Sequence, residues 1–299
     1  MHGTAGRTSL PPVPQPAAPP APGRGGGLLA WSRALPGRGG GSGSPPGVGA
    51  ARGAVLALTS RAGAGWAPPG AGGVPPGPYD GLDLALHVGD DEAAVRASRR
   101  ALADELAGRG AREVRYLQQV HGADVLVVDE VGPGGADEVP DAPAVDAAVT
   151  AVPGVALAVL VADCVPVVMA DPVAGVVGVA HAGRRGALLG APVRAVEAMR
   201  GLGARDVVAV LGPSICARCY EVPADLRAAV AAEHPVGAST TWEGAPSLDV
   251  AALVLEQLAA AGVRAEQVPG CTAERADLWS YRRDGAASGR TAGLAWVPA

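Results

Sequence analysis

The centre of the chain is a succession of apolar runs with few polar positions between them. Val, Ala and Leu dominate the segments AAVTAVPGVALAVLVADC, VPVVMAD and GVVGVAHAG, at residues 147–164, 165–171 and 175–183. A strand with one face in water alternates apolar and polar residues, whereas a strand covered on both faces is apolar throughout. These segments therefore predict strands buried on both sides.

Shorter patterns on either side predict the remaining elements. Further strands are expected at 53–61, 82–89, 114–122, 123–130, 206–212 and 291–298. Helices are expected at 92–110, 186–202, 223–233 and 249–261. This mixture predicts an α+β fold, a single mixed domain in which mixed β-sheets are flanked by helices.

The helix expected at 92–110 has the clearest signals. Asp90 and Asp91 stand immediately before it, where a carboxylate can accept backbone N–H groups as an N-cap. Val95, Leu102 and Leu106 recur at helical spacing, so this face is expected to pack on the core.

The first 52 residues differ in composition from the rest. LPPVPQPAAPPAPGRGGG and GRGGGSGSPPGVG consist almost entirely of Pro, Gly, Ala and Ser. Such segments bury too little apolar surface to offset the entropy of ordering. We expect a disordered tail over residues 1–52 and a catalytic domain over residues 53–299.

Composition narrows the class of protein. The net charge is −5, so nothing suggests a nucleic-acid-binding surface. No apolar stretch is long enough for a transmembrane helix, and no signal peptide is recognisable. Four cysteines without an export signal indicate reduced thiols, and we expect a cytoplasmic protein.

Three chemically capable residues stand where buried strands run into loops: His121, Cys164 and His181. Two imidazoles and a thiolate suit zinc, and three protein ligands leave a position open, as in catalytic sites. Their sequence spacing carries no local metal motif, so the residues alone favour a structural role for each of the three.

Six segments in order carry a family resemblance. They are GPYDGLDLALHVGDD (77–91), QQVHGADV (118–125), DAAVTAVPGVALAVLVADCVPVVMADP (146–172), GVVGVAHAGRRG (175–186), LGPSICARCYEV (211–222) and SYRRDGAASGRTAGLAWV (280–297). From about Gly53 to Pro298 the chain resembles the YfiH/YlmD family, known as multicopper polyphenol oxidase or laccase-domain proteins.

The resemblance implies a zinc-dependent purine nucleoside phosphorylase with a YfiH-like fold. The substrates would be adenosine, guanosine, inosine and 5′-methylthioadenosine with phosphate, and adenosine would also be deaminated. His121, Cys164 and His181 would hold one Zn²⁺ per chain, for which Cu²⁺ is an adventitious substitute. The partners would be small molecules, without nucleic acid or membrane, and the oligomeric state stays open.

The resemblance also implies substrate contacts. The turn after His181 would bind phosphate, with Arg185 as a bidentate clamp. Arg61 matches a family arginine and is a second candidate for phosphate, and Asp83 is a further candidate in the substrate and phosphate site. Asp163, beside Cys164, is a candidate general base or ligand-orienting residue.

This chain departs from the family pattern at several positions. Arg184 replaces a Trp, so a stacking surface is exchanged for a charge, and Asp83 replaces an Asn. Cys216 replaces a Gly and creates the sequence CARC. That CxxC can be a redox or metal motif, but without a second CxxC two ordinary thiols are the favoured interpretation.

Other polar residues are ambiguous. His87 is either a substrate contact or a packed histidine, and His234 is expected at the surface. For three arginines near the C-terminus, structural ion pairs are favoured over catalysis: Arg282, Arg283 and Arg290.

Two alternative functions remain. A copper-binding polyphenol oxidoreductase would need several copper centres and many histidines, and the chain has five histidines. A Cys-based hydrolase of cell-wall precursors would use Cys164 as nucleophile and His181 as its base; the family fold resembles that of a toxin deamidase with such a pair.

Overall fold

The computed structural model describes residues 28–37, 53–61, 77–132 and 144–299. Its helices are α1 (Glu92–Ala107), α2 (Arg184–Leu188), α3 (Ala191–Gly201), α4 (Ala224–Glu233), α5 (Val250–Ala260), α6 (Tyr281–Asp284) and the 3-10 helix η1 (Pro235–Gly237). Its strands are β1 (Leu29–Leu35), β2 (Ala54–Thr59), β3 (Glu113–Tyr116), β4 (Val125–Val128), β5 (Ala147–Thr150), β6 (Val155–Val161), β7 (Val165–Asp171), β8 (Val176–Ala182), β9 (Val208–Leu211), β10 (Ala238–Thr240), β11 (Pro246–Leu248), β12 (Arg264–Gln267) and β13 (Thr291–Trp296).

The strands form two mixed sheets and a small hairpin. One sheet has five strands in the order β1-β2-β13-β6-β3, and the other has six in the order β12-β9-β7-β8-β5-β4. Strands β10 and β11 pair with each other apart from both. The predicted α+β fold with mixed sheets and flanking helices is confirmed.

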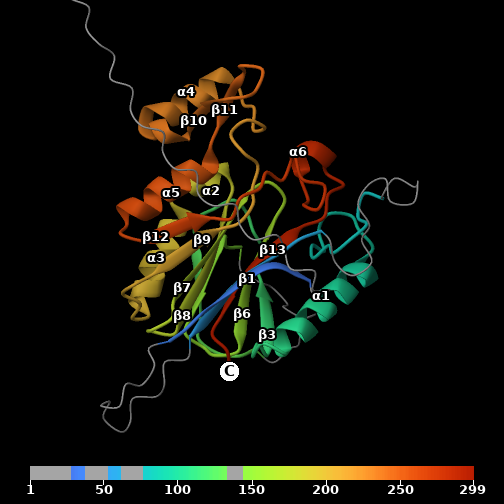
Figure 1. Ribbon diagram of the computed structural model, residues 1–299, viewed down its shortest axis with the longest axis vertical. Coiled ribbons are helices and arrows are strands. Elements are labelled where there is room, and N and C mark those ends of the chain that lie inside the picture. Colours follow the sequence, from blue (N-terminus) through green and yellow to red (C-terminus); the bar gives the residue numbers. More distant parts are fainter. Residues whose placement is uncertain (1–27, 38–52, 62–76, 133–143) are drawn as a thin grey trace, which may run out of the picture.

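Four layers result from the packing of these sheets (Figure 1). One core cluster lies between the sheets and includes Leu157 of β6 and Val168 of β7. A second cluster joins the six-stranded sheet to α3 and α5, and a third joins the five-stranded sheet to α1.

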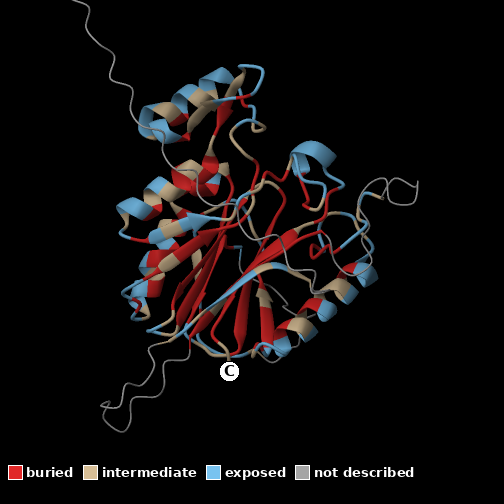
Figure 2. Ribbon diagram, in the orientation of Figure 1, coloured by how far each residue is buried: buried red, intermediate tan, exposed pale blue. Residues whose placement is uncertain are grey.

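The two-sided burial follows from strand alternation. In β8, Val177 and Val179 belong to the cluster between the sheets, whereas Val176 and Ala180 belong to the cluster under the helices. Every residue of β5, β6, β7 and β8 is buried, as the apolar runs predict (Figure 2).

The cap of α1 is confirmed as well. The Asp91 side chain accepts the N–H of Ala94, and Val95, Leu102 and Leu106 form the buried face. The helix ends at Ala107, slightly before the predicted end.

Three of the sequence predictions are wrong. Residues 82–89 contain no strand: Leu82 and Leu84 are buried, but their N–H groups bond the carbonyls of Arg61 and Arg290 instead of a neighbouring strand. The helix expected at 186–202 is two helices, α2 and α3, because Gly190 adopts a left-handed conformation (φ 76°) between them.

The third error lies in the supposed tail. Residues 29–35 form β1, which pairs antiparallel with β2 along its length. Trp31 and Leu35 pack against the core between the sheets, which supplies the burial that composition did not reveal. The rest of the expected tail, 1–27 and 38–52, lies outside the described residues.

No helix in the described part of the chain is long and apolar enough to cross a membrane.

The core between the sheets makes a direct prediction. Val168→Ala removes two methyl groups from a fully buried position, so it is expected to lower the free energy of unfolding by about 2 kcal/mol. Val173→Ala in the turn after β7 is the matched control, since Val173 is 50% exposed, and it should change stability by less than about 0.5 kcal/mol. Urea unfolding measures both, and equal effects would contradict the assigned core.

Candidate metal centre

Three connections between the two sheets meet at one end of the molecule. They are the β3–β4, β6–β7 and β12–β13 connections, and each joins a strand of one sheet to a strand of the other. His121 lies in the first of them and Cys164 in the second. Residues far apart in sequence are therefore brought together at this end.

Strand register completes the cluster. Strands β7 and β8 are antiparallel, with Val165 opposite Ala182 and Pro166 opposite His181. Cys164, the residue just before β7, therefore lies beside the end of β8, where His181 is the second-last residue.

The structure brings His121, Cys164 and His181 together. One ligand atom from each lies within 4.8 Å of the others, and the two imidazole centroids are 4.8 Å apart. Gly183 makes this approach possible, because a Cβ there would lie 2.5 Å from His121 Nδ1 and 3.0 Å from Cys164 Sγ. A thiolate and two imidazoles at this spacing are a donor set that fits zinc.

Asp146 orients the cluster, and the sequence analysis missed it as a site residue. Its fully buried carboxylate lies 2.7 Å from His181 Nδ1, and it accepts the N–H groups of Val120, His121 and Gly122. A carboxylate at one ring nitrogen directs the other toward a metal. The available signals were its position immediately before β5 and its place as the first residue of the family segment 146–172.

The electrostatics favour a thiolate. Burial alone would raise the pKa of Cys164, but His181 and His121 outweigh it and lower that pKa to about 6. Burial alone would lower the pKa of His181, but Cys164 and Asp146 raise it to about 9. Each charged form is stabilised by its neighbour, so Cys164 is favoured as the thiolate, the form that binds a metal or acts as a nucleophile.

Backbone strain is concentrated at the same place. Among the described residues other than glycine, only His121 (φ 57°) and Asp163 (φ 87°) have positive φ. Asp163 is held by two bonds of 2.6 Å, from the Thr272 hydroxyl and from the Arg282 N–H. Its carboxylate thereby ties the turn before Cys164 to the β12–β13 connection.

A cleft of about 680 Å³ opens over the cluster. His121, Cys164, His181 and Asp163 all line it. Three arginines also line it and provide positive charge: Arg184, Arg282 and Arg290. Its wall further contains His87, Gln119, Ile215, Tyr220 and Tyr281. We call Arg184, Arg282 and Arg290 the cleft arginines. For Arg282 and Arg290, the sequence favours structural ion pairs instead.

Arg185 does not line the cleft and is exposed, contrary to the expected phosphate clamp. The first turn of α2 directs the preceding residue, Arg184, inward. Consecutive residues of a helix point about 100° apart, so Arg185 leaves the helix in a different direction from Arg184 and lies at the surface.

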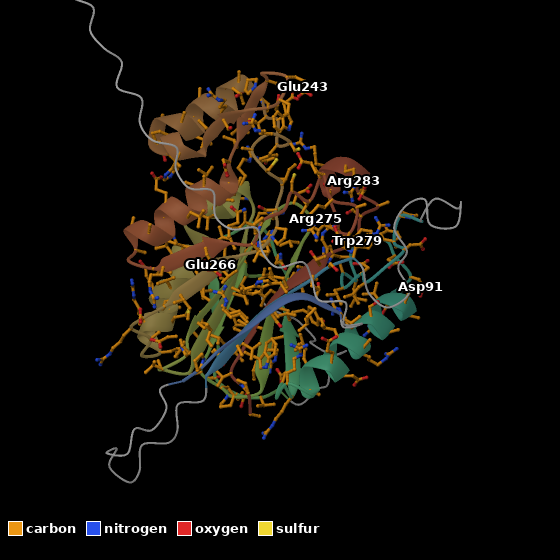
Figure 3. The ribbon with its side chains drawn as sticks, in the orientation of Figure 1. Asp91, Glu243, Glu266, Arg275, Trp279 and Arg283 are labelled. Atoms are coloured by element: carbon orange, nitrogen blue, oxygen red, sulfur yellow. The ribbon has the colours of Figure 1, made fainter. Side chains whose placement is uncertain are left out.

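Arg61 is also away from the cleft lining. It is 7% exposed, and its guanidinium donates to the carbonyls of Asp80 and Gly77 and stacks 4.0 Å from the Trp279 ring. Figure 3 shows Trp279 in the segment that leads from β12 to α6. These contacts hold Arg61 against a loop and the Trp279 ring, outside the residues that line the cleft.

Asp83 is buried behind the cleft. Its Oδ1 accepts the N–H groups of Ala85 and of the cleft residue Arg290, and its Oδ2 is buried without a hydrogen-bond partner among the described residues. Burial, aided by nearby Asp90, raises the pKa of Asp83 to about 6 against the two N–H bonds. It positions Arg290 and does not line the cleft.

Residues 70–298 match the family described as multi-copper polyphenol oxidoreductase laccase. The chain belongs to this family. The YfiH/YlmD resemblance seen in the sequence is thereby confirmed.

Named relatives are similar over most of their length. A Streptomyces griseus protein named purine nucleoside phosphorylase ORF3 is 52% identical over 229 residues, which are 76% of this chain and 91% of that protein. Purine nucleoside phosphorylase YlmD of Geobacillus stearothermophilus is 36% identical over 83% of this chain and 90% of its own.

Solved structures agree on the fold. YlmD from Geobacillus stearothermophilus superposes with a TM-score of 0.68 at 33% identity, covering 86% of this chain and 95% of its own. Neisseria meningitidis NMB0706 gives 0.67 at 32% identity, covering 82% of this chain and 95% of its own.

Asp83 predicts a specific pH dependence. Its pKa of about 6 in the folded chain exceeds the unfolded value of about 3.9, so stability decreases as pH rises from about 4 to about 6 and then levels off. Asp83→Asn keeps an oxygen for the two N–H groups and removes this titration. It is expected to gain up to about 3 kcal/mol over the wild type at pH 7 and little at pH 4.

Urea unfolding at several pH values measures this difference. Asp129→Asn, at an exposed position, is the control and should follow the wild-type curve. A pH-independent difference between Asp83→Asn and wild type would contradict the raised pKa.

Proposed function

We propose that this chain is a zinc-dependent purine nucleoside phosphorylase. It uses phosphate to release the base from adenosine, guanosine, inosine and 5′-methylthioadenosine, and it also deaminates adenosine. The observation that carries the proposal is a Cys-His-His donor set at the floor of an arginine-lined cleft of about 680 Å³. The names of the relatives support the same reaction class.

His121, Cys164 and His181 are the proposed zinc ligands, with Asp146 holding His181 through Nδ1. A zinc ion bound there would supply a Lewis acid with a position open to substrate or water. A thiolate is a soft donor and an imidazole a borderline one, and both suit zinc. A copper oxidase with several copper centres would need more histidines than the five in the whole chain.

The cleft arginines provide the phosphate site in this proposal. Arg184 enters from α2, Arg282 from α6, and Arg290 from just before β13. Phosphorolysis joins a phosphate oxygen to C1′ as the bond from C1′ to the base nitrogen breaks. Guanidinium groups around the phosphate offset its charge and orient it for this displacement.

The remaining wall suits a nucleoside. Tyr281 is exposed and offers an aromatic face, which compensates for the Trp that Arg184 replaces in the family pattern. Burial, Arg290 and Arg99 lower the pKa of His87, so its neutral ring can donate and accept hydrogen bonds to a base. Asp163, held by Thr272 and Arg282, is proposed as a positioning residue and as the candidate base.

One observation favours a second candidate, a Cys-based hydrolase. Cys164, His181 and Asp146 have the order of a nucleophile, its base and the group that orients the base, and the pKa of Cys164 is lowered to about 6. In that case Cys164 would attack an acyl or amide carbon while no metal is bound.

Cys164→Ala separates these functions. Purified without added metal, the variant is expected to contain one zinc fewer per chain than wild type. Phosphate-dependent base release and adenosine deamination should both fall by more than about 100-fold. Losing a residue that only supports a metal ligand costs about 10- to 100-fold, and losing the ligand itself should cost more. Metal analysis and chromatography of the products measure this. A metal-free wild type that is inactive on nucleosides, with Cys164 open to alkylation, would contradict the proposal.

Arg184 and Arg185 form a matched pair for the phosphate site. Arg184→Ala is expected to raise the KM for phosphate by about 10- to 100-fold, the value of a charged hydrogen bond, whereas Arg185→Ala should change it by less than about 2-fold. Steady-state kinetics at saturating nucleoside measures both. The reverse order would restore the assignment based on the family turn.

A further inference from the structure

A second cluster of ligand-type side chains lies outside the cleft. Cys216, Cys219, Cys271 and Glu274 each direct one ligand atom to a common point, and these atoms all lie within 4.8 Å of one another. None of the four lines the cleft. The missing partner of the CARC sequence is therefore CTAE, at residues 271–274, and not another CxxC.

The two halves have the same backbone conformation. The carbonyl of Cys216 accepts the N–H groups of Cys219 and Tyr220, and the carbonyl of Cys271 accepts those of Glu274 and Arg275. Each half is thus a single tight turn whose first and fourth residues point to the same side. A parallel bridge between Ser214 and Cys271 holds the two turns face to face.

The spacing fits a tetrahedral ion. Glu274 Oε1 lies 3.4 Å from Cys219 Sγ and 4.0 Å from Cys216 Sγ. Around zinc, with bonds of about 2.3 Å to sulfur and about 2.1 Å to oxygen, neighbouring ligands lie about 3.6–3.8 Å apart. The Cys216 N–H also donates to Cys271 Sγ at 3.3 Å, so the backbone of the first turn holds the sulfur of the second.

We propose that Cys216, Cys219, Cys271 and Glu274 bind a structural Zn²⁺. Binding releases the protons of the three thiols, and the thiolates and the Glu274 carboxylate complete four-coordination. Three thiolates select a soft or borderline ion such as zinc over Mg²⁺ or Ca²⁺. With four protein ligands the site is closed, unlike the three-ligand cluster in the cleft.

This ion would fix one wall of the cleft. Ile215 and Tyr220, which flank the first turn, both line the cleft. Thr272, next to Cys271, donates to Asp163, and its carbonyl accepts from Arg283. Arg283 belongs to α6, which also carries the cleft residues Tyr281 and Arg282, and its guanidinium donates to the carbonyl of Arg275 (Figure 3). The site therefore joins the segments after β9 and β12 that shape the substrate pocket.

Zinc analysis of full-length variants tests this proposal. In a Cys164→Ala background, which removes a ligand of the cleft site, the chain is expected to keep one zinc. Adding Cys219→Ala should abolish that zinc, and Glu274→Gln should weaken zinc binding at least 10-fold in chelator competition. Glu243→Gln, at another exposed glutamate, is the control and should leave binding unchanged.

Cobalt substitution provides a readout independent of activity. Co²⁺ in the Cys164→Ala background should give thiolate-to-cobalt charge-transfer bands that disappear with Cys219→Ala. Zinc that persists in Cys164→Ala/Cys219→Ala, or no zinc in Cys164→Ala, would overturn the proposal. So would a Cys216–Cys219 disulfide in the chain as purified, seen as an intact mass lower by two hydrogen atoms and assigned by peptide mapping.

The two metal proposals fail separately. Wild type with one zinc that survives Cys164→Ala but not Cys219→Ala supports the structural site and contradicts the cleft site. One zinc with the opposite dependence contradicts the structural site alone.

Discussion

Two stacked sheets can share a core only if the chain crosses between them, and these crossings determine where the chemistry of this protein lies. Buried strands leave no room for a substrate within the layers, since β5, β6, β7 and β8 are covered on both faces. Polar groups are concentrated instead where the chain leaves one sheet for the other. The β3–β4, β6–β7 and β12–β13 connections supply His121, Cys164 and Arg282 to the same cleft.

The Asp146 carboxylate links these crossings to the sheet. A buried carboxylate needs several donors to remain charged, and Asp146 receives three backbone N–H groups and the His181 ring. The bonds lower the pKa of Asp146 against the effect of burial. They also hold the loop of His121 against the end of β8, so the same group satisfies its own charge and orients the donor set.

The arginines show how context decides role. Arg61 and Arg283 use their guanidinium groups on backbone carbonyls, which fixes loops around the cleft. Arg184 and Arg290 reach the cleft wall from α2 and from the start of β13. Sequence motifs include both kinds, because a structural guanidinium and a substrate-binding one are the same residue type with different neighbours.

Much of the architecture was determined by local pattern. Apolar runs predicted β5, β6, β7 and β8, and an acidic cap with helical spacing predicted α1, because burial and capping act over a few residues. The candidate ligands His121, Cys164 and His181 were also recognisable, from strand ends and from family segments. Pattern failed where pairing was remote: β1 depends on β2, and the alternation at 82–89 reflects packing without a strand partner.

Only the tertiary structure decided which polar residues meet. Asp146 lies 35 positions from His181, and Glu274 completes the CARC cluster from 55 positions beyond Cys219. Arg184 and Arg185 are adjacent and chemically identical, yet only the first lines the cleft. Local patterns determine which elements form, because they reflect short-range burial; the packing of those elements determines the site, because its distances join residues that no local pattern relates.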